Sequence, residues 1–549
     1  MPPFNRFPDT PVGQKPLLFH VRNFGGMNQR SGGTRMALKD EQFFWQENLW
    51  PIQNGNLESG LSDGATVFTT AKTIINAYFY TINLNPFCIA FFSDGTATQF
   101  HTVTGAQTVV SAVANQFFMG SYVPVAVQWN AAGIIIAAAD IANGYFAWDG
   151  TTLFLPGSAA PNWLTNTTPT TMPSGVRGNQ IEVYQNRVWL TIPPVVPPGT
   201  PTPALIQVSA PSNGADFNVA DGSVITPQQD ASLRSQFNAL KQTNGFLYPV
   251  GDSNLSSISN VQTGGSPVIT TYFNQNLSTQ EGASWPNSAQ LFDQALMYAN
   301  FKGVYVVNGG IPIKVSDDID NLFLNLSAST TTPSAAIATV FQIKHYLLMI
   351  STVDFKGVRR NVMVVWNGKQ WFVASTLNAN TNQIFTQEFN SELTAWGSDG
   401  NHMFPLFQVF STSLKKQLQS KLYAAGDGDD GWITYKKQYR FYWEVADLSA
   451  QGITLNATMD NELGSTPLVV SSSLNTFFEF ANNSNQIIHF QNVSLVTIVW
   501  GVQAAGAAIN GFDVSNYGRL LGWTAEFVGG AYSIIAMAAE YTYDAPFLG

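Results

Sequence analysis

Short apolar runs that end in turn residues dominate the chain. The runs are rich in Val, Ile, Phe, Tyr and Thr, as expected for strands. Many of them end in Asn-Gly or Asp-Gly, which accept the positive φ angles of a two-residue hairpin turn. These dipeptides stand at Asp94–Gly95, Asn143–Gly144, Asp149–Gly150, Asn308–Gly309, Asn367–Gly368, Asp427–Gly428 and Asn510–Gly511. The pattern predicts an all-β chain that meanders from hairpin to hairpin.

Helical periodicity is scarce by comparison. The two best matches are Asp230–Lys241, "DASLRSQFNALK", and a short run near Ser288–Asn300. We therefore expect short helices at these two places and strands through most of the remaining chain.

One unit recurs along the chain: an apolar strand, a short turn, a second strand, then a Gly/Asp turn and an aromatic residue. Its copies begin near residues 87, 133, 186, 245, 302, 345 and 421. A propeller blade of four antiparallel strands needs about 40 to 50 residues, close to the shorter of these spacings. Closing the blades into a ring also removes most exposed sheet edges. We predict a β-propeller of six or seven blades over residues 61–437, with inserts.

The pattern changes near residue 438, where longer strands alternate with a period of two. One face of the first strand carries Phe441, Trp443 and Val445, with Tyr439 before them. The opposite face carries Arg440, Tyr442 and Glu444. This pattern predicts a C-terminal β-sandwich-like region, residues 438–549, packed on the propeller. Residues 1–60 are then expected to form an N-terminal arm that closes the ring or docks to a partner.

Charge is unusually low in this chain of 549 residues. Charged residues make up 11%, against about 25% in typical soluble domains. Such a composition suits a subunit whose surface is largely covered by neighbours. The net charge of −10 and the absence of any lysine cluster beyond Lys415–Lys416 and Lys436–Lys437 argue against tight nucleic-acid binding. A surface that lets nucleic acid pass without holding it stays open.

Targeting and redox features are few. Cys88 is the single cysteine and lies in the apolar run "FCIAFF", so we expect an inert core thiol. The N-terminal "MPPFNRFPDTPVG" lacks an apolar signal-peptide core, and no run reaches 18 apolar residues. We expect neither a signal peptide nor membrane insertion.

Catalytic and metal-binding motifs do not stand out. The chain has no Walker, HExxH or CxxC motif. Its five histidines are scattered without ligand spacing: His20, His101, His345, His402 and His489. "GDGDDG" at Gly426–Gly431 resembles half of a calcium loop, but Gly431 stands where a ligand is needed, which favours a tight turn. "SDDIDN" at Ser316–Asn321 is a similarly weak match. We predict no enzyme activity, cofactor or metal site.

A proline-rich insert occupies Pro193–Pro203. Its simplest interpretation is an extended loop between two strands of one blade. The alternative is a docking loop for a partner, with Pro193, Pro194, Pro197 and Pro198 as candidate contacts.

The densest run of charged and aromatic residues lies between Asn23 and Gly55. It contains a glycine pair followed by a hydrophobe and Asn, then a run close to L-x-x-x-(D/E)-x-x-x-x-x-N in which the acidic residue stands one position early, and a glycine turn. The residues at these positions are Gly25, Gly26, Met27 and Asn28, then Leu38, Glu41 and Asn48, then Gly55 and Asn56. This signature resembles tail nozzle proteins of short-tailed bacteriophages (podoviruses), the tail tubular protein B and tail-stabilisation class. Val188–Asn218 and Gly518–Tyr543 are similar to later parts of the same proteins.

The resemblance implies a virion structural protein: a β-propeller subunit in a homohexameric ring of the viral tail, assembled in the host cytoplasm. It implies a tail adaptor above the ring, tail fibres or tailspikes as further partners, and double-stranded DNA passing along the axis without specific binding during ejection. An acidic net charge suits such a passage, because like charges repel. The resemblance implies no catalytic residues.

The segment Asn23–Gly55 then has two interpretations. In the first it closes the ring of blades or docks to a neighbouring subunit. Its candidate contacts are Gly25, Gly26, Arg30, Arg35, Phe43, Phe44, Trp45 and Trp50. In the second it forms a small helix near Leu38–Leu49 that plugs the propeller.

Two other functions compete with the tail nozzle. One is a propeller adhesin that binds a host glycan or attaches tail fibres. The other is a polysaccharide-cleaving propeller, which requires carboxylates that meet within about 5 to 10 Å. Nothing in the sequence marks such a pair.

Overall fold

The computed structural model describes residues 17–30, 35–52, 55–165, 170–194, 204–227, 236–326, 333–424, 435–447, 453–461, 464–474, 490–491, 497–498 and 508–543. The chain divides into two compact units. One holds residues 63–368 and 378–407, and the other holds residues 1–62, 369–377 and 408–549.

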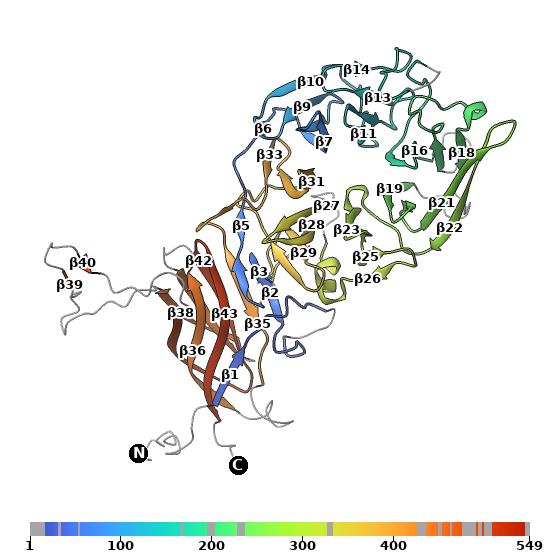
Figure 1. Ribbon diagram of the computed structural model, residues 1–549. Helices are drawn as coiled ribbons and strands as arrows, with labels where there is room; N and C mark the ends of the chain where they lie inside the picture. Colours follow the sequence, from blue (N-terminus) through green and yellow to red (C-terminus); the bar gives the residue numbers. More distant parts are fainter. Residues whose placement is uncertain are drawn as a thin grey trace, which may run out of the picture. The chain divides into compact units, whose positions relative to one another are not determined.

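The first unit is a β-propeller. In its described part, six four-stranded antiparallel sheets and the three antiparallel strands β27–β29 form seven blades around a common centre (Figure 1). The first three blades are β7–β10 (Ile74–Ile82, Asn85–Phe92, Ala97–His101, Gln107–Ser111), β11–β14 (Val125–Asn130, Gly133–Ala137, Tyr145–Trp148, Leu153–Phe154) and β15–β18 (Gln180–Tyr184, Arg187–Ile192, Leu205–Val208, Val224–Pro227).

The remaining blades complete the ring. They are β19–β22 (Phe237–Thr243, Phe246–Gly251, Leu255–Gly264, Ile269–Ser278), β23–β26 (Gln290–Phe292, Ala295–Asn300, Gly303–Val307, Ile313–Lys314), β27–β29 (Ser334–Val340, Ile343–Val353, Arg359–Trp366) and β31–β33 (Gln383–Phe389, Glu392–Ser398, His402–Pro405). The seventh blade gains its outer strand from β6 (Phe68–Thr69), which precedes the first blade in sequence. Pairing β6 with β33 closes the ring.

The predicted repeat corresponds to the propeller blades, but its copies do not begin where the blades begin. Most of its copies begin at the second strand of a blade, as at β8, β12, β16, β20 and β28. The copy near residue 421 lies outside the propeller unit, and the seventh blade at β31–β33 was missed. The second strands are the most continuously apolar, so they dominate the sequence signal.

Both predicted helices are wrong. Phe237–Thr243 forms the strand β19, whereas the start of that predicted helix lies outside the described residues. The run near Ser288–Asn300 forms β23 and β24. Short apolar strands of three to seven residues imitate helical spacing when a turn interrupts them.

Helical turns are short in the described residues. They are η1 (Val219–Asp221), η2 (Pro286–Ser288), η3 (Asp317–Ile319) and α1 (Asp320–Leu324). Within that part of the chain, no helix combines the length and the apolar character needed to cross a membrane.

The second unit is a β-sandwich built from both ends of the chain. One sheet orders β3 (Leu49–Pro51), β4 (Leu57–Ser59), β43 (Tyr532–Tyr543), β36 (Lys436–Asp447) and β41 (Ala508–Gly518), with β1 (Leu17–Val21) also paired to β43. The other contains β30 (Trp371–Ala374), β2 (Phe43–Glu47), β35 (Lys416–Ser420), β42 (Leu521–Gly529), β37 (Ile453–Asn461) and β38 (Gly464–Leu474). Two further pairs bring together β5 (Leu61–Ser62) with β34 (Val409–Phe410), and β39 (Phe490–Gln491) with β40 (Thr497–Ile498).

The sandwich core confirms the alternation seen near residue 438. Phe441, Trp443 and Val445 are buried in it together with Phe527 and Ile534. The domain boundaries differ from the prediction, because β1–β5 are strands of this unit and do not form a separate arm. Residues 369–377 and 408–437, which the sequence pattern predicts as part of the propeller, also belong to this unit.

Most of the turns between the first two strands of a blade consist of residues other than Asn-Gly or Asp-Gly, so the sequence pattern does not mark them. The turns between the first two strands of six blades have positive φ at two consecutive residues. They are Asn83–Leu84, Gln185–Asn186, Asn244–Gly245, Asp293–Gln294, Phe341–Gln342 and Asn390–Ser391. Most predicted Asn-Gly and Asp-Gly turns instead join outer strands, and Asn510–Gly511 lies inside β41.

Candidate functional site at the propeller hub

Polar side chains near the start of the inner strands, most of them amides, join neighbouring blades at six of the seven joints in the described propeller. Asn76 Nδ2 donates to Pro124 O at 2.8 Å, across the joint between the first and second blades. Asn179 Nδ2 donates to Phe237 O at 2.7 Å, across the joint between the third and fourth. We call these contacts the blade latches.

The latches continue around the ring. Asn238 Nδ2 donates to Ala283 O, Gln290 Nε2 to Ala335 O and Gln383 Nε2 to Ile75 O, at 2.7, 2.9 and 3.4 Å. At the joint between the sixth and seventh blades, Ser334 Oγ accepts from Ile384 N at 2.8 Å. Sequence analysis missed this set, although each member lies at or within two residues of the start of an inner strand.

The inner strands surround a small cavity at the hub. The cavity measures about 170 Å³, and residues of all seven blades line it. Tyr78, Gln180, Lys241, Gln290 and Phe385 are among these residues. At roughly 30 Å³ per molecule, the cavity has room for a handful of waters. Typical ligand pockets start at about 300 Å³, so this cavity is smaller than most of them.

Lys241 is the charged residue that lines the hub cavity. Burial raises the pKa of the nearby Glu182 carboxyl, whereas attraction to Lys241 lowers it. Burial also raises the pKa of the Tyr78 hydroxyl, which accepts a hydrogen bond from Gln128 N at 2.8 Å. The phenol therefore stays protonated and acts as a structural contact between the first two blades.

A second cavity of about 340 Å³ adjoins the first and shares Gln180, Pro286 and Asn287 with it. Its lining includes Ser121, Tyr122, Gln236, Asn287 and Gln383. Neither the hub nor this cavity has an aspartate or glutamate among its described lining residues. The described residues also contain no group of three or more His, Cys, Asp or Glu side chains arranged to hold a metal ion.

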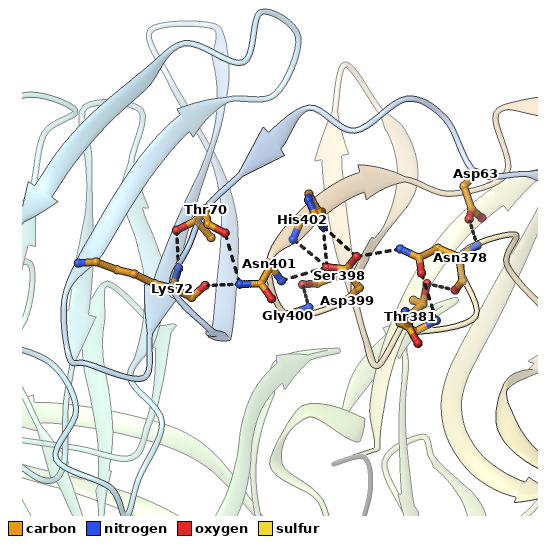
Figure 2. A network of polar contacts seen from close by, with 11 residues as sticks. Asp63, Thr70, Lys72, Asn378, Thr381, Ser398, Asp399, Gly400, Asn401 and His402 are labelled. Atoms are coloured by element: carbon orange, nitrogen blue, oxygen red, sulfur yellow. Dashed lines mark hydrogen bonds and ion pairs between the residues drawn. The ribbon is translucent and has the colours of Figure 1, made fainter.

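A polar network secures the closure between the seventh and first blades (Figure 2). Asp399 accepts from His402 N, Asn401 N and Asn378 Nδ2 at 2.8, 3.0 and 2.9 Å, and its Oδ2 lies 2.9 Å from His402 Nδ1. Burial alone would raise the pKa of Asp399, but these hydrogen bonds outweigh it and lower the pKa to about 2.

The same turn reaches the segment that leads into the first blade. Asn401 Nδ2 donates to Thr70 O and Lys72 O, both at 3.3 Å, and Ile74 N donates to Gly400 O at 2.7 Å. Asp399 thus fixes a turn whose backbone and amide hold the two ends of the ring together (Figure 2).

The glycine pair predicted as a docking element has a structural role in the sandwich unit. Gly25 N donates to Glu41 O at 2.7 Å, and a Cβ at Gly25 would lie 2.6 Å from Glu41 Cγ. Gly26 has φ +79°, and a Cβ there would lie 2.8 Å from Gln370 Cβ. Both positions lack room for a side chain.

The predicted aromatic cluster is largely internal. Phe43, Trp45 and Trp50 are at most 1% exposed, and Phe44 is half-buried. Phe43 belongs to the sandwich core, Trp45 Nε1 donates to Glu47 Oε2 at 2.9 Å, and Trp50 packs edge-on against Phe372. The helix predicted near Leu38–Leu49 is wrong, because β2 and the start of β3 occupy this segment.

The two arginines of this segment differ. Arg30 is exposed. Arg35 forms an ion pair with Asp460 at 2.9 Å and donates from Nε to Ser420 O at 2.9 Å. Burial lowers the pKa of Arg35, and Asp460 opposes that shift. Arg35 therefore ties the N-terminal segment to β35 and β37, and the ring of blades is closed elsewhere, by β6.

The remaining predicted sites are only partly described. The proline-rich insert joins β16 and β17, which pair within one blade, as expected. Pro193 is buried and Pro194 half-buried, whereas Pro197, Pro198, Gly426–Gly431 and His489 lie outside the described residues. Asp317 and Asp320 of the other acidic run form ion pairs with Lys314. Cys88 is buried, as expected, and burial raises the pKa of its thiol.

No family model matches the chain, and no curated protein matches it. Similar solved structures include YCF48 bound to a D1 peptide, at 10% identity and a TM-score of 0.36 over 66% of this chain and 98% of that chain. BBS1N in complex with ARL6DN matches at 10% identity and 0.34, over 63% and 96%. Trypanosoma rangeli sialidase matches at 8% identity and 0.30, over 96% of both chains. At these TM-scores the similarities say nothing of ligand or activity.

Proposed function

We propose that the protein is a virion structural protein: a tail nozzle subunit of a short-tailed bacteriophage. In this role it forms a homohexameric ring that continues the tail channel, retains the genome and conducts double-stranded DNA during ejection. A tail adaptor and tail fibres or tailspikes are its proposed partners.

One observation carries the proposal: the residues of the nozzle-like signature occupy positions with strict structural demands. Gly26 and Gly55 have φ +79° and +83°, and a Cβ at Gly55 would lie 2.6 Å from Asn23 Oδ1. Asn48 has φ +54°, donates from Nδ2 to Ser375 Oγ and Lys415 O, and accepts from Ser375 N. The signature residues thus act as a building element of the sandwich, and this structural role is what supports the proposal.

The small size of the hub cavities constrains how such a subunit works. Volumes of about 170 and 340 Å³ are those of a few waters or a small ligand, far too little for a DNA duplex. In the proposed ring, the DNA passage therefore runs between copies of the chain and not through the propeller hub. The chain's low content of charged residues, 11%, suits a surface covered by such copies.

Native mass spectrometry and electron microscopy of the purified full-length chain test the proposal. We expect a closed hexameric ring with an axial opening that admits duplex DNA, and the same ring at the tail of particles that contain this protein. A monomer at micromolar concentration that also stays monomeric with the adaptor present would overturn it.

A further inference from the structure

A third cavity lies between the second and third blades of the propeller. It measures about 350 Å³, which falls within the range of small-ligand pockets. Two tryptophans line it: Trp129, the fifth residue of β11, and Trp163, in the connection between β14 and β15. Both are half-buried and pack against the apolar core shared by these blades.

The position of Trp163 is fixed by its surroundings. Asn130 Nδ2 donates to Trp163 O at 2.9 Å. A Cβ at Gly133 would lie 2.4 to 2.7 Å from three atoms of the Trp163 indole, so the ring covers this glycine. Gly133 thus provides the space in which the indole lies, and the cavity wall is preorganised before any ligand arrives.

Neutral polar groups provide the rest of the lining. Asn162, Asn186 and Ser212 are exposed at the cavity, and Ser212 N donates to Asn186 O at 2.7 Å. The described lining contains no Asp, Glu, Lys or Arg. Amide and hydroxyl groups both donate and accept hydrogen bonds, which matches the hydroxyls of a sugar. The electron-rich face of an indole attracts the C–H groups on the apolar face of a pyranose ring.

We propose that this cavity, which we call the Trp129–Trp163 pocket, is a binding site for a neutral saccharide. A phosphorylated or carboxylated ligand has no cation in the described lining to offset its charge, so nucleotides and acidic sugars are disfavoured. The site is independent of the proposed ring function. If both hold, the subunit also contacts a glycan, and either can fail without the other.

Saturation-transfer NMR on the full-length protein provides the first test. The probes are N-acetylglucosamine, galactose, glucose and rhamnose, with N-acetylneuraminic acid and glucose 1-phosphate as anionic comparisons. We expect binding of at least one neutral sugar, with a Kd of about 1 mM or tighter, and a change in tryptophan fluorescence. No binding of any neutral sugar up to about 10 mM, or binding of the anions alone, would overturn the proposal.

Variants then locate the site. Trp129→Ala and Asn186→Gly should each weaken binding at least tenfold, whereas Trp129→Phe should retain most of it. Asn186 has φ +56°, so glycine preserves the turn and removes only the amide. Asn390→Gly, in the matching turn of the seventh blade with φ +51°, is the control and should bind as the wild type does.

Folding of each variant is checked by its thermal unfolding curve. Asn162→Ala changes an exposed side chain and keeps the test informative if Trp129→Ala fails to fold. Equal affinities of the wild type, Asn162→Ala and Asn186→Gly would place the sugar elsewhere and refute the pocket.

Discussion

At the residue scale, this protein depends on backbone positions that tolerate few side chains and on polar groups with several hydrogen-bond partners. Gly26, Gly55 and Gly95 all have positive φ and close neighbours. Asp399 accepts hydrogen bonds from the Asn378 amide and from two backbone N–H groups, and it also contacts the His402 imidazole.

Crowding and backbone strain can be separated with two glycines of the propeller. Gly95 and Gly175 have φ +79° and +75°, but a Cβ at Gly95 would lie 2.5 Å from Asn115 Cα, whereas Gly175 has no neighbour within 4 Å. We expect Gly175→Ala to lower the free energy of unfolding by about 1 kcal/mol and Gly95→Ala by clearly more, about 3 kcal/mol. Chemical denaturation measures the free energy of unfolding of both variants. Equal losses would show that the residues around Gly95 move aside at no energetic cost.

The closure network predicts a dependence of stability on acid. The pKa of Asp399 is about 2 in the folded protein and about 3.9 in an unfolded chain. Its stabilisation, about 2 kcal/mol, is thus complete above about pH 4 and is lost as the pH falls through about 2. We expect Asp399→Asn to be less stable than the wild type at pH 6.

Denaturation curves at several pH values measure this difference. The gap between wild type and Asp399→Asn should shrink below about pH 4 and vanish near pH 2. A gap that stays constant from pH 6 to pH 2 would show that the ionised carboxylate is not the stabilising group.

At the element scale, each strand and turn is formed by residues that are neighbours in the sequence. The contacts between blades, in contrast, join residues that are far apart in the sequence. Each blade is formed by neighbouring hairpins, which is why the repeat was visible in the sequence. The latches join strands far apart in the chain, such as Asn179 before β15 and Phe237 in β19. The closing strand β6 pairs with β33, more than three hundred residues away.

A buried blade latch should contribute more to the free energy of unfolding than an exposed amide side chain does. Asn179 is 4% exposed, donates to Phe237 O and accepts from Thr191 Oγ1 at 2.8 Å. We expect Asn179→Ala to lower the free energy of unfolding by about 1 to 3 kcal/mol, because it leaves buried groups without partners. Asn162→Ala, at an exposed position, is the control and should change it by less than about 0.5 kcal/mol. Equal small losses would mean that the joints are held by apolar packing alone.

At the scale of the whole molecule, two units share one chain, and neither is a continuous segment. The sandwich takes residues from the beginning, the middle and the end of the sequence. The hub cavities are too small for duplex DNA, so the proposed conduction of DNA requires several copies. The charge of the chain also affects how it would interact with DNA. The chain carries 25 basic and 35 acidic residues, so its net charge has the same sign as that of DNA.

The assembled protein should therefore bind duplex DNA weakly. We expect no retention of a duplex by micromolar protein in an electrophoretic mobility assay at about 150 mM salt, because phosphate contacts need clustered cations. A stable shifted band under these conditions would contradict a passage that lets DNA slide.

The sequence by itself determined the fold class, the turn-rich all-β repeat, the alternation of the C-terminal strands and the buried state of Cys88. These follow from local patterns, since side-chain periodicity and turn residues act over a few positions. Only the tertiary structure decided the phase of the blades, the closing strand β6, the latches and the place of Asn23–Gly55 inside the sandwich. Each of these depends on contacts between residues far apart in the chain. Local sequence patterns do not specify which distant strand pairs with a given strand.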